Sequence, residues 1–207
     1  PGEIVEANGR RGLIYERLDG ISMVQYLHAR PWTLFKHARS LAELQVQINR
    51  QSIAGLPSHK DRLNYDIRNT AYLSEELREK ALTMLAVLPD EQTLCHGDFH
   101  PGNILITKRG PVVIDWMTAC RGAPWADVAR TTLLLTIGPK AAGKQISPIL
   151  KIAVGFYCRA YRSRYQSLVP DPEKQMERWL PVIAAARLSE DIVPERGALL
   201  KMVKEGM

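Results

Sequence analysis

The stretch that decides the fold runs from Cys95 to Trp116: Cys95-His96-Gly97-Asp98-Phe99-His100-Pro101-Gly102-Asn103, then Ile104-Leu105-Ile106-Thr107, a Lys108-Arg109-Gly110 turn, and Pro111-Val112-Val113-Ile114-Asp115-Trp116. Its two apolar runs, on either side of the turn, predict the strands of an antiparallel hairpin. Asp98 and Asn103 precede the first strand and Asp115 follows the second, so the hairpin should bring these three side chains together. Carboxylate and amide oxygens are ligands that suit Mg²⁺, and such a trio can hold the ion against a polyphosphate.

Three interpretations of this stretch compete. Asp and Asn are common in polar loops, where they cap turns. His96, Asp98 and His100 alternate like the metal ligands of a hydrolase that uses zinc or manganese, although Asn103 and Asp115 would then have no role. The third interpretation is the catalytic loop of kinases, which has a His-x-Asp-x-x-x-x-Asn pattern followed by a strand pair that ends in a metal-binding Asp. Order, spacing and strand context agree together with the third interpretation, which we favour.

Three segments resemble motifs of the aminoglycoside phosphotransferase and choline kinase group, namely residues 96–103, residues 114–116 (Ile-Asp-Trp) and residues 122–129 (Gly-Ala-Pro-Trp-Ala-Asp-Val-Ala). The resemblance extends from about Leu13 to the C-terminus. It implies an α+β, mainly helical fold that corresponds to the C-terminal lobe of a protein-kinase-like fold, with short hairpins at the hinge and the catalytic loop. It also implies ATP-dependent phosphorylation of a hydroxyl group on a small molecule, with ATP and Mg²⁺ as cofactors.

The resemblance also assigns roles to residues of the central stretch. Asp98 would be the catalytic base, while Asn103 and Asp115 would hold Mg²⁺. His100 is a candidate contact of the transferred phosphate, because protein kinases often place a Lys at that position. His96 and Asp127 would support the catalytic loop rather than take part in the chemistry.

The resemblance places a nucleotide site near the N-terminus. Residues 13–20 would form the edge strand and hinge, where the Glu16 carbonyl and the Leu18 amide bind the purine and Tyr15 closes the back of the pocket. Leu105 and Ile114 would form the apolar floor under adenine. Judged without the resemblance, residues 13–20 can equally be an ordinary strand and turn.

We expect two units in this chain. Residues 1–19 would be the end of an N-terminal lobe with the hinge, and residues 20–207 a helical C-terminal lobe with the catalytic and metal-binding loops. A complete kinase has a Gly-rich loop, a strand Lys and a helix Glu ahead of the hinge, whereas the residues before Leu13 contain no Lys. The expectation is therefore a fragment without most of the N-terminal lobe, inactive by itself. This leaves a non-catalytic nucleotide-binding module as an alternative function.

Elsewhere, apolar residues at helical spacing predict helices over residues 21–27, 31–50, 58–66, 70–88, 127–137, 147–168, 172–189 and 195–204, with a loop over 138–143. Residues 3–7 and 12–18 read as strands joined by an Asn8-Gly9 turn. The aromatic residues Phe156, Tyr157, Tyr161 and Tyr165 fit either core packing or the wall of an acceptor pocket.

The composition and charge of the chain argue against several classes of binding partner. The chain has 207 residues, 45% of them hydrophobic, and a formal net charge of +6, but its Lys and Arg residues form no dense run, which disfavours nucleic acid. No apolar run approaches the roughly 20 residues of a membrane helix. Cys95, Cys120 and Cys158 form no CxxC pair and fit free thiols in a cytoplasmic protein. From Lys151 onward there are ten Lys or Arg against seven Asp or Glu, so no acidic excess marks a site for a polycation. The acceptor hydroxyl compound and the oligomeric state stay open.

Overall fold

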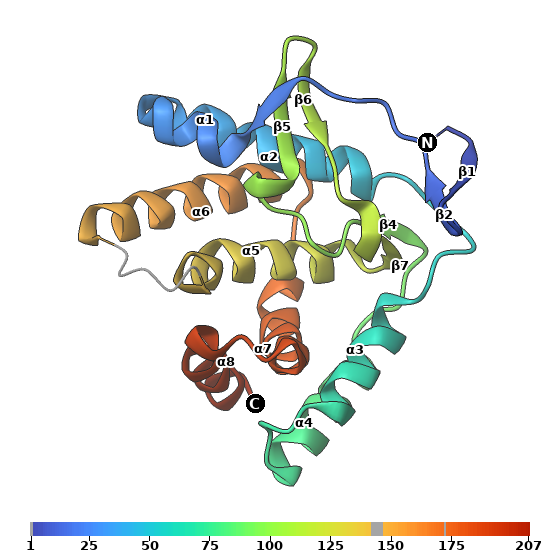
Figure 1. Ribbon diagram of the computed structural model, residues 1–207. Coiled ribbons are helices and arrows are strands. Elements are labelled where there is room, and N and C mark those ends of the chain that lie inside the picture. The colour runs from blue at the N-terminus through green and yellow to red at the C-terminus, as the bar shows by residue number, and fades with distance from the viewer. Residues whose placement is uncertain (1, 142–146, 172) are drawn as a thin grey trace.

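The computed structural model describes residues 2–141, 147–171 and 173–207, and it is mainly helical with a few short strands (Figure 1). This agrees with the α+β, mainly helical class that the sequence predicts. The strands form three small separate sheets rather than one continuous sheet. The helices therefore make the core, and the sheets carry loops at its edge.

The predicted central hairpin is present. Strand β5 (Ile104–Thr107) pairs antiparallel with β6 (Gly110–Val113), with Ile104 opposite Val113 and Thr107 opposite Gly110. A third strand, β3 (Gly20–Ser22), pairs with the other edge of β5 and places Ser22 opposite Leu105. Ile104 is fully buried in the core. This small sheet thus connects the segment that precedes residue 20 to the central stretch.

A second strand pair, which the sequence did not predict, brackets the loop. Strand β4 (Thr93–Cys95) pairs antiparallel with β7 (Cys120–Gly122), so that Cys95 lies opposite Cys120. A 3-10 turn over Trp116–Thr118 leads into β7, within the segment that we expected to replace an activation segment. The pairing closes a loop around residues 96–119 and fixes both of its ends.

The core is built from packed helices. Helix α2 (Leu34–Asn49) packs on α6 (Pro148–Leu168), and α5 (Pro124–Ala141) packs on α7 (Gln175–Arg187), which also contacts α8 (Val193–Gly206). Figure 1 shows α5 between the α2–α6 pair and the α7–α8 pair. The largest fully buried side chains include Trp179, Tyr161 and Tyr165. Tyr157, Tyr161 and Tyr165 are therefore core residues, whereas Phe156 is exposed.

Several helical boundaries differ from the prediction, and α5 begins at Pro124 rather than at residue 127. The predicted helix over 70–88 is α4 (Glu75–Val87), because Ser74 caps it by accepting a hydrogen bond from the Leu77 amide. The expected loop over 138–143 is wrong for residues 138–141, which continue α5, and its remainder lies outside the described residues. Helix α7 begins at Gln175, and the Asp171 carboxylate accepts hydrogen bonds from the Gln175 and Met176 amides. The predicted start, residue 172, lies outside the described residues.

The other helices follow the prediction closely. Helix α1 (Met23–Ala29) begins with a capping box in which Ser22 and Gln25 exchange side-chain and backbone hydrogen bonds. A 3-10 turn over Pro31–Thr33 precedes α2. Helix α3 (His59–Asn69) is capped by Ser58, and α3 and α4 both pack on α7. Together they place the first turn of α3 beside β7, at the edge of the central loop.

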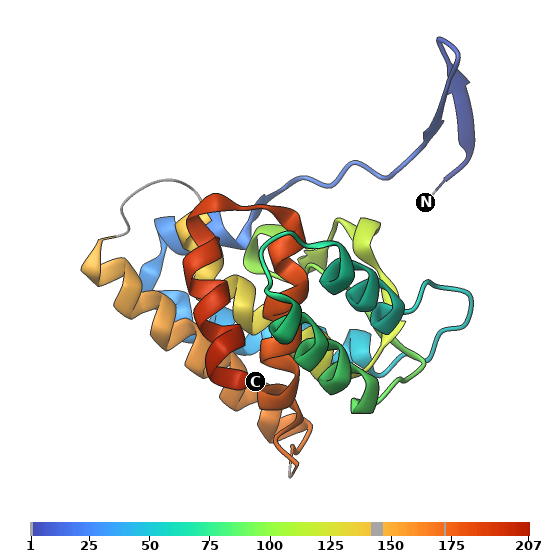
Figure 2. The same cartoon turned by 90° about the horizontal axis from the view of Figure 1, so that it is seen from below.

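The N-terminal hairpin stands apart from the helical body (Figure 2). Strands β1 (Ile4–Ala7) and β2 (Arg10–Leu13) pair through an Asn8-Gly9 turn in which both residues have positive φ, as this turn type requires. All residues of both strands are exposed. Strand β2 ends at Leu13, although Ile14 still makes backbone hydrogen bonds with Gly2 and Glu3. The predicted strand over 12–18 is wrong beyond Ile14, where a segment without strand pairing follows.

None of the described helices is long and apolar enough to cross a membrane. The three cysteines are free and buried, which confirms the prediction of unpaired thiols.

Candidate functional site

The three predicted magnesium and base residues lie on one short loop system. The Asn103 amide nitrogen donates to the backbone oxygen of Asp98 at 2.9 Å and to its Oδ2 at 3.3 Å. Next to the paired residues Ile104 and Val113 of β5 and β6, the Ile114 amide donates to the Asn103 carbonyl at 3.0 Å. Asp115 follows Ile114 directly, so the hairpin brings the backbones of Asn103 and Asp115 together and the Asn103 side chain to Asp98.

Asp115 has an unusual backbone conformation. Its φ of 62° and ψ of 64° lie in the left-handed region, which non-glycine residues rarely adopt. Its side chain is exposed, and within the described part of the chain the carboxylate accepts no hydrogen bond and joins no ion pair. Backbone strain that is not offset by a contact within the protein is typical of residues that bind a ligand.

Asp98 is surrounded by positive or hydrogen-bonding groups. His100 Nε2 lies 3.6 Å from Asp98 Oδ2, and Arg130 Nη2 of α5 lies 3.9 Å from Oδ1. The His100 side chain, aided by the charge of Arg130, holds the pKa of Asp98 below its usual range even though partial burial opposes this shift. Asp98 is therefore a carboxylate at neutral pH, with both oxygens able to accept hydrogen bonds.

His100 has a defined tautomer. Its Nδ1 accepts a hydrogen bond from the Gly102 amide at 3.0 Å, so the proton of the neutral ring is on Nε2, which faces Asp98. The structure thus places His100 against the predicted base. Its contact with a transferred phosphate stays a prediction.

Asp127, predicted to support the loop, hydrogen-bonds to the loop backbone. Its side chain is fully buried at the start of α5. Oδ1 accepts a hydrogen bond from the Gly97 amide at 2.9 Å, and Oδ2 accepts one from the His96 amide at 3.3 Å. One carboxylate therefore fixes two consecutive backbone groups immediately before Asp98.

His96 ties the two sides of the loop together. Its Nε2–H donates to the Ile114 carbonyl at 3.0 Å, and its Nδ1 accepts from the Asp98 amide at 3.2 Å. The ring is fully buried and packs against Phe99 and Trp116. Both ring nitrogens are therefore occupied by backbone groups on either side of the site, which is a supporting role.

A buried polar layer behind Asp127 was not predicted from the sequence. Gln45 and Asn49 of α2 donate side-chain amide hydrogen bonds to Asp127 Oδ2 at 2.9 and 3.3 Å. The hydroxyls of Tyr161 and Tyr165 in α6 donate to the Gln45 and Asn49 oxygens in turn. Two of the aromatic residues considered for an acceptor pocket thus orient the amides that hold the loop anchor.

Gly97 is required by the loop geometry. Its φ is +78°, and a Cβ atom at this position would lie 2.5 Å from the backbone oxygen of Thr118. No larger side chain fits without moving that backbone, because real Cβ atoms do not come this close to a carbonyl oxygen. The Thr118 hydroxyl also donates to the His96 carbonyl at 2.9 Å, so this close approach belongs to the same loop closure.

The predicted nucleotide residues occupy neighbouring segments. Leu105 of β5 and Ile114, just after β6, are half-buried and lie outside the main core cluster. Tyr15 is 67% exposed and Leu18 is half-buried, both in the extended segment that leads into β3. The Glu16 carboxylate pairs with Arg109 of the β5–β6 turn at 2.5 Å. Their contacts with a purine stay a prediction.

The donor set fits Mg²⁺. Because the Asn103 nitrogen is committed to Asp98, the Asn103 oxygen is left as the acceptor. Asp115 directly follows Ile114, whose amide bonds the Asn103 carbonyl. Amide and carboxylate oxygens are the ligands that Mg²⁺ prefers. In the described residues, no group of three or more His, Cys, Asp or Glu side chains could hold a metal ion. The zinc or manganese hydrolase has no support either, since both nitrogens of His96 are bonded to backbone groups.

Arg130 was missed by the sequence reasoning. Its Nη2 lies 2.7 Å from Glu190 Oε1 as well as 3.9 Å from Asp98. Glu190 also pairs with Arg187, whose guanidinium makes two hydrogen bonds to the fully buried Glu195. The one available signal was helical spacing, since Arg130 lies one turn after Asp127 and so faces the same loop.

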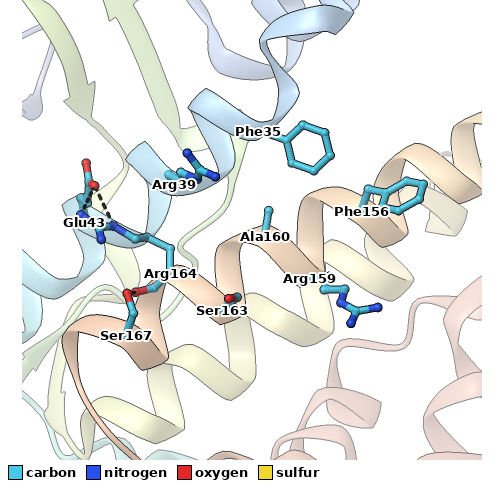
Figure 3. Close-up of a pocket in the computed structure, with 9 residues that line it drawn as sticks. All are labelled: Phe35, Arg39, Glu43, Phe156, Arg159, Ala160, Ser163, Arg164 and Ser167. Atoms are coloured by element: carbon cyan, nitrogen blue, oxygen red, sulfur yellow. Dashed lines mark hydrogen bonds and ion pairs between the residues drawn. The ribbon is translucent and has the colours of Figure 1, made fainter.

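A separate groove of about 760 Å³ lies between α2 and α6 (Figure 3). Phe35 and Phe156 stand at one end, and the Glu43–Arg164 ion pair closes the other. Phe156, one of the aromatic residues considered for an acceptor pocket, lines this groove, but none of the predicted catalytic, metal-binding or nucleotide-binding residues does.

The sequence of this chain was compared with those of known protein families. A sequence profile of the phosphotransferase enzyme family matches residues 2–165. The chain belongs to this family. The match covers the hinge segment, the loop with Asp98 and Asn103, the β5–β6 hairpin with Asp115, and the anchor Asp127. This supports a small-molecule phosphotransferase. No curated protein sequence gives a significant match.

Solved structures show the protein-kinase-like fold of this family. A thermostable mutant of aminoglycoside phosphotransferase APH(4)-Ia in its apo form is 17% identical, with a TM-score of 0.61 over 92% of this chain and 71% of that chain. A choline/ethanolamine kinase family protein from Mesorhizobium loti is 11% identical, with a TM-score of 0.52 over 99% of this chain and 72% of that one. A glucosamine kinase in complex with glucosamine, ADP and inorganic phosphate is 16% identical, with a TM-score of 0.49 over 90% of this chain and 51% of that one.

Proposed function

We propose that this protein transfers the γ-phosphoryl group of ATP to a hydroxyl group of a small molecule. One observation carries the proposal, namely the convergence of Asp98, Asn103 and Asp115 through the Asn103–Asp98 hydrogen bonds and the Ile114–Asn103 backbone bond. A base and two metal-binding oxygens in this order are the parts that phosphoryl transfer needs, since its catalysis is mostly positioning and charge stabilisation. The family membership supports the same reaction class.

Asp98 receives the proton of the acceptor hydroxyl. The acceptor oxygen attacks the γ-phosphorus, the bond from that phosphorus to the bridging oxygen breaks, and ADP leaves. Because His100 keeps the pKa of Asp98 low, the carboxylate is a weak base that aligns the hydroxyl first and takes its proton late in the transfer. Its position depends on the Asn103 amide and on the backbone amides that Asp127 holds.

Asn103 and Asp115 would hold Mg²⁺ through their side-chain oxygens. When bound, the ion would neutralise the charge of the nucleotide phosphates. Leu105 and Ile114 offer an apolar surface for the adenine ring, and the segment with Tyr15, Glu16 and Leu18 offers backbone groups to its edge. We place the protein in the cytoplasm, where ATP is available.

The test is the Asp98→Asn substitution in the full-length protein, assayed by ATP consumption against a panel of hydroxyl compounds. Asparagine keeps the size of the side chain but cannot take the proton, so turnover should fall about 100-fold or more while ATP affinity stays within about twofold. The matched control is Asp61→Asn, an exposed residue in the first turn of α3. Turnover near the parent rate in Asp98→Asn would show that Asp98 is not the base. ATP binding without turnover of any acceptor by the parent protein would favour the non-catalytic nucleotide-binding module.

A further inference from the structure

A small cavity lies beside Gly97, the residue that precedes the proposed base. Its volume is about 20 Å³, enough for one oxygen-sized group but not for a whole substrate. It is formed by the first turns of α3, the Gly97 backbone, Arg130 of α5 and the end of α7 with the following turn. Arg130 connects it to Asp98 at 3.9 Å. A group in this cavity would thus lie near any molecule whose hydroxyl reaches Asp98.

Arginines outnumber carboxylates around the cavity, three to two. Its two carboxylates, Asp66 and Glu190, are each paired with arginines that line the same cavity: Asp66 with Arg62 at 4.0 Å, and Glu190 with both Arg130 and Arg187 at 2.7 Å. Burial also raises the pKa of Asp66, which weakens its tendency to carry charge. The cavity thus offers no carboxylate to an ammonium group and surrounds any occupant with guanidinium groups, which repel cations.

Two buried nitrogen atoms of the cavity residues have no hydrogen-bond partner in the structure, His59 Nδ1 and Arg130 Nε. His59 is 6% exposed, and burial lowers its pKa to about 4, so its ring is neutral at physiological pH. A guanidinium N–H can only donate, whereas a neutral imidazole nitrogen can accept. A hydroxyl group within reach of both atoms would satisfy both, because its oxygen accepts from Arg130 while its hydrogen is donated to His59.

We propose that this cavity is a subsite for a second, non-reacting hydroxyl of the acceptor, and that the acceptor is a neutral polyhydroxylated compound such as a sugar or polyol. This rests on the proposed phosphoryl transfer at Asp98. The reacting hydroxyl meets Asp98, and a neighbouring hydroxyl enters the cavity between Arg130 and His59. A polycation is disfavoured by the same arginines that neutralise the carboxylates. The family's aminoglycoside members therefore do not indicate the acceptor of this protein.

The test compares matched acceptors in the full-length protein. D-glucose, D-ribose, myo-inositol and glycerol are the neutral probes, and D-glucosamine and kanamycin are the cationic ones. We expect kcat/KM to be at least tenfold higher for the best neutral compound than for either cation. Among the singly deoxygenated analogues of that compound, one should lose about 10- to 100-fold in kcat/KM, because it leaves the buried nitrogens unpaired.

The His59→Leu variant assigns that loss to the cavity. It should lower kcat/KM for the hydroxylated acceptor by the same factor, leave the deoxygenated analogue nearly unaffected, and keep ATP affinity. His59→Gln, which can still accept and donate, should restore part of the activity. His28→Leu is the matched control, because His28 is exposed at the end of α1.

The outcomes separate the two proposals. Preference for a cation, turnover of none of the neutral probes, or equal losses of His59→Leu on the hydroxylated and deoxygenated acceptors would overturn the cavity proposal. If a cation is phosphorylated and Asp98→Asn abolishes this activity, the phosphotransferase proposal stands while the cavity proposal fails. If turnover survives Asp98→Asn, the assigned chemistry fails first.

Discussion

The Asp127→Asn substitution is the sharpest test of how the loop around Asp98 is held. Four donors point at this fully buried carboxylate: the Gly97 amide at Oδ1, and the Gln45, Asn49 and His96 nitrogens at Oδ2. Asparagine keeps one acceptor oxygen. The less costly orientation turns this oxygen toward the three donors and sets the new NH₂ group against the Gly97 amide.

The magnitude follows from that single lost contact. A hydrogen bond to a charged acceptor contributes about 1.5–3 kcal/mol, and two opposed buried donors cost about 1–3 kcal/mol more, partly offset by removing a buried charge. We expect the free energy of unfolding to fall by about 2–4 kcal/mol. Because the lost bond holds the amide next to Asp98, turnover of the full-length protein should fall at least tenfold as well.

Urea unfolding monitored by circular dichroism measures the stability change. The control is Asp61→Asn in the first turn of α3, an exposed residue whose change should stay within about 0.5 kcal/mol. A loss below about 1 kcal/mol for Asp127→Asn would refute the view that this carboxylate fixes the loop. A loss of stability with full turnover would mean that the anchor serves folding alone.

Three further predictions concern the loop itself. Gly97→Ala should destabilise the fold by about 2–4 kcal/mol in urea unfolding, since its Cβ would meet the Thr118 oxygen at 2.5 Å; a loss under 1 kcal/mol would contradict this. Asp115→Gly should stabilise the chain by up to about 1 kcal/mol in calorimetry, because glycine adopts positive φ freely, yet abolish turnover; retained activity would remove Asp115 from the metal site. His100→Gln should raise the pKa of Asp98, since His100 lowers it most in the folded state. Ionised Asp98 stabilises the fold above the pKa it has in the unfolded chain, and this stability is lost as the pH falls through its pKa in the folded protein. In His100→Gln the loss should therefore occur at a higher pH. The acidic limb of the kcat/KM profile should move to higher pH as well. An unmoved limb would show that Asp98 does not control it.

The central stretch could be predicted because its information is local. The spacing from Asp98 to Asn103, the Lys108-Arg109-Gly110 turn and the apolar runs around it specify a hairpin without reference to the rest of the chain. Ser74 is a local signal that the apolar pattern overrode in the prediction. It precedes two Glu residues and marks the true start of α4, but the apolar pattern alone extended the predicted helix back to Thr70.

Features that depend on tertiary contacts could not be read from the sequence. Strands β4 and β7 have three residues each, too few for an alternating pattern to show. Gln45 and Asn49 sit on a helix whose spacing marks them as inward-facing, but only packing against α6 and α5 shows which carboxylate they serve. Arg130 gains its position beside Asp98 from a partner, Glu190, that lies far along the chain.

The loop departs from local rules in three ways, and each departure points at the same place. Asp115 is held at positive φ without a compensating contact. Gly97 lies so close to the Thr118 backbone that no side chain would fit there, and Asp127 buries a carboxylate that needs four donors. A fold selected only for stability would avoid all three, because each costs free energy that ordinary residues would not lose. Their common effect is to fix the backbone on both sides of Asp98 and to leave the oxygens of Asn103 and Asp115 uncommitted. Uncommitted oxygens on a rigid loop are what phosphoryl transfer requires, so the distribution of strain itself supports a catalytic role over a structural one.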